Sequence, residues 1–161
     1  MSLHLIQREL EGITILTLRG RLVAGNEVSE FRSLIQTLVS EGRARVILDL
    51  AETHRIDSSG LGVLIEAYNM AKSGGGALKL LNLTECSAQL LVLTRLSTVF
   101  EVFNDEQSAI NSFFPDREVK RFDILQFVKN SEKKKRDSSY STDSPTSLAA
   151  NDSQSALKSR S

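Results

Sequence analysis

The chain has 161 residues, of which 40% are hydrophobic and 25% charged, and its 20 Lys and Arg balance its 20 Asp and Glu. This length is enough for one folded domain of about 110 residues followed by a tail. The absence of a net basic charge argues against nucleic-acid binding, and the single cysteine, Cys86, excludes an internal disulfide.

The start of the chain lacks the pattern of a signal peptide, and no run approaches the roughly 18 apolar residues of a membrane span. The sequence therefore predicts a cytoplasmic protein without a membrane-spanning segment. Cys86 fits this reading, because reduced thiols are usual in that compartment. We expect it to be a small buried residue.

Apolar patterning predicts strands and helices that alternate along the chain. Alternating residues on either side of Glu11-Gly12 predict an antiparallel hairpin, and helices between the later strands predict parallel pairing through right-handed crossovers. The expected elements are strands at residues 3–6, 13–20, 46–50, 77–81 and 99–103 and helices at residues 26–41, 58–73, 84–96 and 105–114. These elements predict an α/β fold, a mixed β-sheet with α-helices packed on it.

Pro115 follows the last of these helices and predicts the end of the domain, which we place at residues 1–114. Residues 115–130 form a short extension whose segment 122–128 either packs back on the domain or serves as a recognition peptide. Residues 131–161 are rich in serine and basic side chains, and we expect them to be disordered. Their run of three lysines and an arginine is either a solvated stretch or a docking patch for an acidic surface.

The stretch from Arg55 to Gly62 joins the apolar run 46–50 to a strongly periodic helix. Its aspartate and two serines are good N-cap residues for that helix. One apolar face is expected to pack on the core, namely Leu61, Leu64, Ile65 and Tyr68. A second apolar stripe beside it is expected to contact a binding partner, namely Val63, Ala67 and Met70.

The position of Ser58 at the start of a helix determines what it can do. A helix N-terminus carries partial positive charge and free N–H donors, so a phosphate on Ser58 would be tolerated without melting the helix. The roughly −1.5 to −2 charges of the phosphate would change what docks on the helix. The alternative is that Ser58 and Ser59 only cap the helix.

Asp57-Ser58-Ser59-Gly60-Leu61-Gly62, preceded by Val46-Ile47-Leu48-Asp49-Leu50, resembles the signature of anti-sigma factor antagonists of the STAS domain family. The resemblance covers residues 3 to about 114. It implies a protein that, when unphosphorylated, binds an ATP-dependent, kinase-type anti-sigma factor and thereby frees a sigma factor. It also implies that the partner phosphorylates Ser58, with Asp57, Ser59 and Gly60 as neighbours of the modified residue, and so inactivates the antagonist.

The resemblance has two departures and one competing interpretation. The loop with Leu22 and Val23 is expected to contact the partner, but related antagonists often carry an acidic residue where this chain has Val23. Arg95 stands where glycine is common, and a left-handed backbone there would cost about 1 kcal/mol. Other STAS proteins are scaffold subunits of lipid-transport or stress-signalling complexes, so the fold alone does not decide between these functions.

An enzymatic function is disfavoured by the residues around the serines. A hydrolase nucleophile would be flanked by glycines two positions away on each side, and neither Ser58 nor Ser59 is. His54 lies on the same segment but has no evident residue to orient it. Two histidines and one cysteine are too few for a metal cluster, so no catalytic residue, metal or cofactor is expected.

Overall fold

The computed structural model describes residues 3–120 and 122–143, with side chains described as far as residue 133. The chain divides into two compact units, residues 1–124 and 125–161. Its elements are β1 (His4–Leu10), β2 (Ile13–Leu22), α1 (Asn26–Ser40), β3 (Arg45–Asp49), β4 (Thr53–Ile56), α2 (Ser58–Ser73), β5 (Ala77–Leu81), α3 (Glu85–Leu93), the 3-10 helix η1 (Leu96–Thr98), β6 (Val102–Phe103), α4 (Glu106–Asn111) and α5 (Ile124–Asp143).

The first unit contains a mixed sheet with strand order β1-β2-β3-β5-β6, and β4 pairs with the end of β2. Among the described strands, β1 and β2 alone pair antiparallel; the other pairs are parallel, with a helix in each connection. The predicted α/β fold with a mixed sheet is therefore confirmed. Strand β4 was not expected, because four residues with Thr and Ile only at the ends carry too short a pattern to predict a strand.

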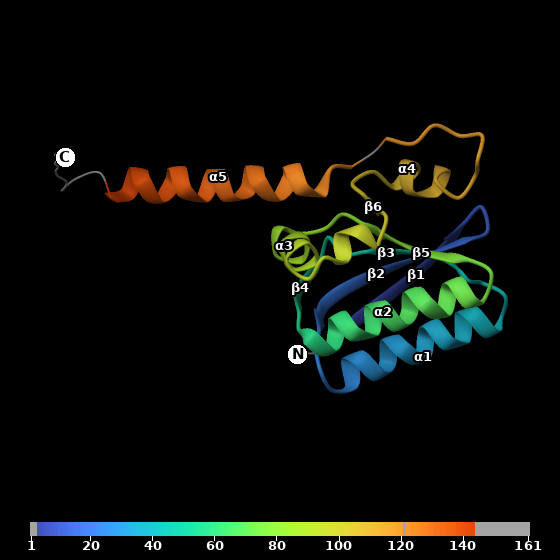
Figure 1. Ribbon diagram of the computed structural model, residues 1–161. Helices are drawn as coiled ribbons and strands as arrows, with labels where there is room; N and C mark the ends of the chain where they lie inside the picture. Colours follow the sequence, from blue (N-terminus) through green and yellow to red (C-terminus); the bar gives the residue numbers. More distant parts are fainter. Residues whose placement is uncertain (1–2, 121, 144–161) are drawn as a thin grey trace. The chain divides into compact units, whose positions relative to one another are not determined.

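Helices cover both faces of this sheet. Figure 1 shows α1 and α2 side by side on one face and α4 on the other, in agreement with the contacts of α2 and α4 with β5. Because side chains alternate along a strand, Val46 and Leu48 of β3 face α1 and α2, whereas Ile47 faces α4. The α4 side has a core cluster of its own, made of Ile13, Ile15, Ile47, Leu81, Phe103, Ala109 and Ile110.

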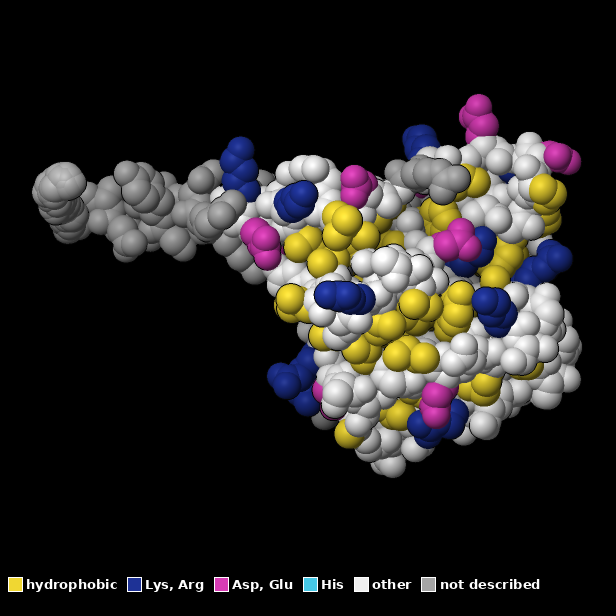
Figure 2. Space-filling view, in the orientation of Figure 1, with side chains coloured by type: hydrophobic (Ala, Val, Ile, Leu, Met, Phe, Trp, Pro, Cys, Tyr) yellow, Lys and Arg dark blue, Asp and Glu magenta, His cyan; other side chains and the backbone are white. Residues whose placement is uncertain are grey.

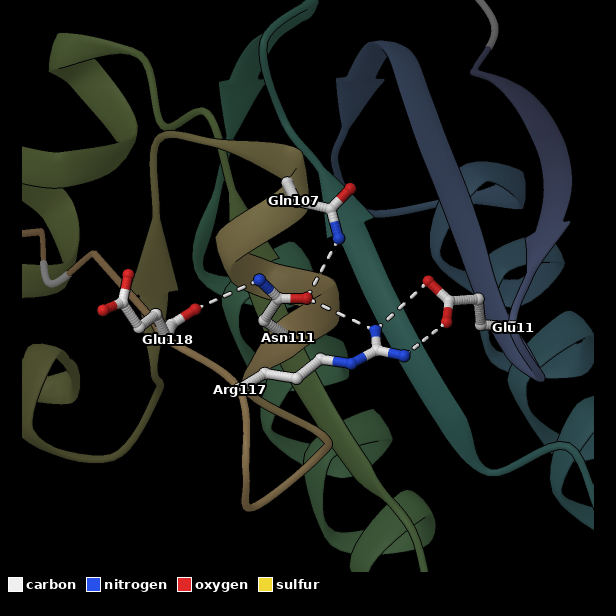
Figure 3. A network of polar contacts seen from close by, with 5 residues as sticks. All are labelled: Glu11, Gln107, Asn111, Arg117 and Glu118. Carbon is white, nitrogen blue, oxygen red and sulfur yellow. Dashed lines mark hydrogen bonds and ion pairs between the residues drawn. The ribbon is translucent and has the colours of Figure 1, made fainter.

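Residues 115–120 lie against α4 and the β1–β2 turn. Both terminal guanidinium nitrogens of Arg117 donate to the Glu11 carboxylate, at 2.8 and 3.2 Å, and Arg117 also donates to the Asn111 side-chain oxygen (Figure 3). The Asn111 amide in turn donates to the carbonyl oxygen of Glu118 at 3.0 Å. This first part of the predicted extension therefore packs on the domain.

Helix α5 provides the described part of the second unit, and it differs from the disorder that we expected from residue 131 on. Residues 124–143 contain neither Gly nor Pro, and Ile124, Phe127 and Val128 recur at helical spacing. Lys and Arg are also good helix formers, so a basic run does not prevent a helix. The remainder of the predicted disordered tail, residues 144–161, lies outside the described residues.

The region after α3 also differs from expectation. Arg95 has a φ of 64°, so the left-handed backbone anticipated at this position is present. Because such a residue reverses the chain direction after a helix, α3 ends at Leu93 and η1 follows. The last strand consequently begins only at Val102 and has two residues instead of the five predicted.

Candidate functional site at the start of helix α2

Asp57 caps helix α2, and the serines after it do not. The Asp57 backbone is extended, and its Oδ1 accepts a hydrogen bond from the N–H of Gly60 at 2.8 Å. Ser58 is the first residue of the helix. This arrangement is the usual one for an N-cap aspartate, whose carboxylate satisfies a donor that the helix itself leaves free.

The same carboxylate also holds the loop between β2 and α1. Asp57 Oδ2 accepts from the N–H of Ala24 at 2.9 Å, and the Asp57 N–H donates to the Leu22 carbonyl oxygen at 3.3 Å. The hydrogen bonds from the N–H groups of Ala24 and Gly60 lower the pKa of Asp57, with a smaller contribution from the positive charge of Arg55. Asp57 is therefore ionised at neutral pH and joins two segments that lie 33 residues apart in the sequence.

Two glycines in the first turn of α2 have different surroundings. A Cβ on Gly60 would lie 2.1 Å from the Leu22 carbonyl oxygen, so no other residue fits there without moving the backbone. A Cβ on Gly62 would meet no atom within 4 Å. Gly60 is thus needed for the close approach of α2 to the end of β2, whereas Gly62 leaves an open surface.

The hydroxyl groups of Ser58 and Ser59 are both at the surface. Both residues are exposed, and within the described part of the chain neither hydroxyl has a hydrogen-bond partner. The prediction that the two serines lie in the first turn of a helix is confirmed. That Ser58 is phosphorylated stays a prediction.

A hollow of about 560 Å³ lies beside Ser59, between the first turns of α1 and α2. Its rim is formed by small residues, among them Ala24, Gly25 and Gly62, and its far end carries an ion pair in which Arg32 Nε lies 2.9 Å from Glu66 Oε1. Polar and apolar groups therefore meet at a concave surface next to the exposed serines, which suits the docking of another protein.

Three of the residues predicted to contact a partner are instead part of the core. Val63, Ala67 and Leu22 are at most 1% exposed, so they offer almost no outer surface to a partner, although Val63 lines the hollow beside Ser59. The second apolar stripe of α2 exists because α2 packs against α1 as well as against the sheet. Of the remaining predicted contacts, Met70 and Val23 are half-buried and reach the surface.

The apolar face of α2 that we expected to be buried is buried only in part. Leu64 is buried, but Leu61, Ile65 and Tyr68 are only half-buried. The ring of Tyr68 packs edge-on against Phe100, with 5.3 Å between the ring centroids. Cys86 was also placed wrongly: it is exposed, in the first turn of α3.

The contribution of Ala24 to the site could not be read from the sequence, because it is made by a backbone N–H, which every residue but proline carries. The adjacency of Arg21 and Arg55 could not be predicted for another reason. They become neighbours only through β4, a strand that was not predicted. The alternation of Arg19 and Arg21 in β2 was the only available signal.

Neither metal binding nor membrane insertion is indicated by the described residues. They contain no group of three or more His, Cys, Asp and Glu side chains placed to hold a metal ion. Among the helices they form, none is long and apolar enough to cross a membrane.

Comparison with known proteins gives consistent matches. The STAS domain pattern matches residues 4–109. The anti-sigma-B factor antagonist of Bacillus subtilis (strain 168) is 34% identical over 64 residues, which are 40% of this chain and 59% of that relative. The chain thus spans less than two thirds of the length of this curated relative.

Three solved structures have the same fold. An anti-sigma factor antagonist from Mycobacterium paratuberculosis has a TM-score of 0.61 at 15% identity over 69% of this chain and 93% of that one. The Bacillus protein SpoIIAA gives 0.53 at 19% identity in its unphosphorylated form, over 68% and 96% of the two chains. Its phosphorylated form gives 0.56 at 20% identity, over 68% and 98%. The match to residues 4–109 covers well over half of the sequence, and the chain belongs to the STAS domain family.

Proposed function

We propose that this chain is an anti-sigma factor antagonist. In its unphosphorylated form it binds a kinase-type anti-sigma factor and so releases a sigma factor. Phosphorylation of Ser58 by that partner, at the expense of ATP, ends the binding. The observation that carries this proposal is the exposed Ser58 hydroxyl at the first residue of α2, which has no hydrogen-bond partner in the described structure.

The capping arrangement supports reversible modification at this position. Asp57 satisfies the N–H of Gly60, so Ser58 can carry a phosphate without giving up the cap of α2. A phosphate at the first residue of a helix also lies near the positive end of the helix dipole. Phosphorylation would then change the surface by roughly −1.5 to −2 charges and leave the fold intact.

The proposed partner surface combines the start of α2 with the adjoining loop. It includes Ser58 and Ser59, the hollow beside them, and the half-buried Val23. Met70, three turns further along α2, lines a separate shallow hollow with Val39 and Gly74 and could extend this surface. Val63, Ala67 and Leu22 support it from beneath.

The names of the similar proteins agree with this proposal. The relative with 34% identity is named an antagonist of an anti-sigma factor, and SpoIIAA has been solved in both a phosphorylated and an unphosphorylated form. Both properties belong to those proteins, and they come to this chain only as a proposal.

The test uses the full chain, ATP and candidate kinase-type anti-sigma factors, with mass spectrometry to locate any phosphate. We expect one phosphate, on Ser58, and loss of partner binding when it is present. Ser58→Ala should bind the partner and resist inactivation, whereas Ser58→Glu should stay folded and lose binding. Ser59→Ala is the matched control, because its hydroxyl is also exposed and it lies one residue further along the same turn.

Two results would contradict the proposal. If the phosphate appears on Ser59 and Ser58→Ala is inactivated like the wild type, the assignment of the modified residue is wrong. If all three variants bind the same partner with unchanged affinity whether or not ATP is present, the domain acts as a scaffold in which Ser58 is only a surface residue.

A further inference from the structure

Two arginines lie next to each other on the surface just before α2. The parallel register of β2 and β4 places Arg21 opposite Arg55, with an irregularity of the register immediately before this pair. Both side chains are exposed, and within the described residues neither takes part in a hydrogen bond or an ion pair. Arg19, two residues earlier on β2, is by contrast neutralised by Glu52, at 2.8 and 3.2 Å.

Two unpaired like charges on neighbouring strands are unfavourable for folding, because each raises the energy of the other. Among the described residues, no carboxylate forms an ion pair with either guanidinium. Glu52 is bound to Arg19, and the carboxylate of Asp57 already accepts two backbone N–H groups. His54, which lies beside Arg55 on β4, is exposed and adds no negative charge.

Arg55 lies close enough to the start of α2 to act on Asp57, the residue before Ser58. Arg55 is followed by Ile56 and Asp57, and its charge contributes to the lowered pKa of Asp57. Figure 2 shows Lys or Arg side chains projecting at the flank of the molecule where Figure 1 places β4 and the start of α2. The helix N-terminus adds partial positive charge to the same region.

We propose that Arg21 and Arg55 receive acidic side chains of the partner protein, and that a phosphate on Ser58 occupies the same arginines and displaces them. This inference rests on the proposed function and adds the chemistry of the partner and the means of release. A guanidinium binds a carboxylate or a phosphate through two parallel N–H bonds, so one receptor serves both anions. Phosphorylation would then release the partner by competition as well as by repulsion.

The binding test uses the anti-sigma factor that phosphorylates the wild-type chain at Ser58. Unphosphorylated Arg21→Gln/Arg55→Gln is expected to bind it about tenfold more weakly than the wild type at low salt, chiefly through slower association. The difference should shrink at about 1 M salt, where charges are screened beyond roughly 3 Å. Arg21→Lys/Arg55→Lys keeps both charges but loses the bidentate geometry, and it should restore part of the affinity.

Arg45→Gln is the matched control, because Arg45 is exposed at the start of β3 and has no ion pair in the described structure. It should bind like the wild type. Equal affinity of the Gln double variant and the wild type would overturn the inference while leaving the proposed function intact. A loss of affinity seen only when nucleotide is bound to the partner would also overturn it, because the arginines would then contact nucleotide phosphates. If the wild type itself neither binds nor is phosphorylated, it is the proposed function that fails.

A second test needs no partner. Phosphoserine is incorporated genetically at position 58 of the full chain, and its second ionisation, ordinarily near a pKa of about 6, is followed by phosphorus NMR. The arginine pair should lower this pKa relative to the same protein carrying Arg21→Gln/Arg55→Gln, since nearby cations favour the doubly charged phosphate. Arg45→Gln should leave it unchanged. Identical pKa values in the wild-type background and the double variant would overturn the competition of phosphate for the arginines.

Discussion

The first turns of α1 and α2 lie side by side but are held in different ways. Helix α1 begins after Gly25, whose φ is 120° and which offers no side chain to cap the helix. Helix α2 begins after Asp57, whose carboxylate bonds both to its own helix and to the N–H of Ala24, just before α1. One side chain therefore positions both helix starts, and the conformation of the β2–α1 loop depends on a residue of the signature.

This difference bears on how the site can be regulated. Helix α1 has no side-chain cap of its own, and the loop before it is held by Asp57. A structural change at the start of α2 can therefore alter the conformation of this loop through Asp57. The hydroxyl of Ser58, the next residue, forms neither the helix cap nor a bond to this loop within the described structure. Modification of Ser58 can therefore alter the surface without breaking the contact that positions the loop.

The largest effect is expected at Gly60, where α2 approaches the end of β2 most closely. Gly60→Ala would place a Cβ 2.1 Å from the Leu22 carbonyl oxygen and 3.1 Å from Ile56 Cγ2, so the backbone must move. We expect a loss of about 3 kcal/mol or more in the free energy of unfolding, at or above the upper end of the range for overpacked cores. Urea denaturation of the full chain measures it. A variant as stable as the wild type would mean that α2 can shift away from β2 freely.

The sequence predicted the start of α2 because caps, glycines and periodicity act locally. It predicted the order of helices and strands for the same reason, since each has its own spacing of apolar residues. It did not predict which flank of α2 is buried. Val63 and Ala67 repeat at a spacing that fits a core contact and a partner contact equally well, and only the position of α1 decides between them.

The contacts between segments far apart in the sequence could not be predicted either, because local sequence patterns do not identify such partners. The bond between Asp57 and Ala24 depends on a backbone N–H, and the bidentate contact of Arg117 with Glu11 joins residues 106 positions apart. Arg117 also lies beyond residues 4–109, the part matched by the family pattern, so neither motif nor periodicity identifies its partner.

A smaller effect is expected when Asp57 keeps its size but loses its charge. In Asp57→Asn a single amide oxygen must serve two N–H donors, and the amide nitrogen, itself a donor, faces one of them. We expect a melting temperature lower by several degrees and faster hydrogen exchange at the Ala24 amide. Asp105→Asn is the matched control: within the described structure this carboxylate hydrogen-bonds to Ser108 of its own helix and not to a distant segment, and asparagine caps a helix nearly as well as aspartate. Equal losses in both variants would show that the bond to Ala24 contributes nothing.

The stabilisation by Asp57 should also depend on pH. The folded-state pKa of Asp57 is lowered, and the hydrogen bond from the Ala24 N–H is the largest cause. The contribution of Asp57 to the free energy of unfolding is therefore fully present above the unfolded-state pKa of about 3.9. That contribution is lost as the pH falls through the folded-state pKa. The difference in melting temperature between the wild type and Asp57→Asn should accordingly be constant from pH 7 to about 5 and narrow below about pH 4. Other carboxylates with lowered pKa values, such as Glu11, affect both proteins alike and cancel in this difference. A difference that stays constant down to pH 2 would contradict the ionised cap.

The smallest effect separates the two glycines of the first turn. Gly62→Ala places its Cβ in open space on a helix, where alanine is favoured over glycine by about 0.5–1 kcal/mol. We therefore expect a modest rise in the free energy of unfolding, measured in the same urea titration as Gly60→Ala. The two substitutions are chemically identical and two residues apart, so opposite signs would locate the close contact at Gly60 alone. If Gly62→Ala were also destabilising, the hollow beside Ser59 would have to be closed in solution. The contrast between Gly60, which has no room for a Cβ, and Gly62, which faces open space, would then be wrong.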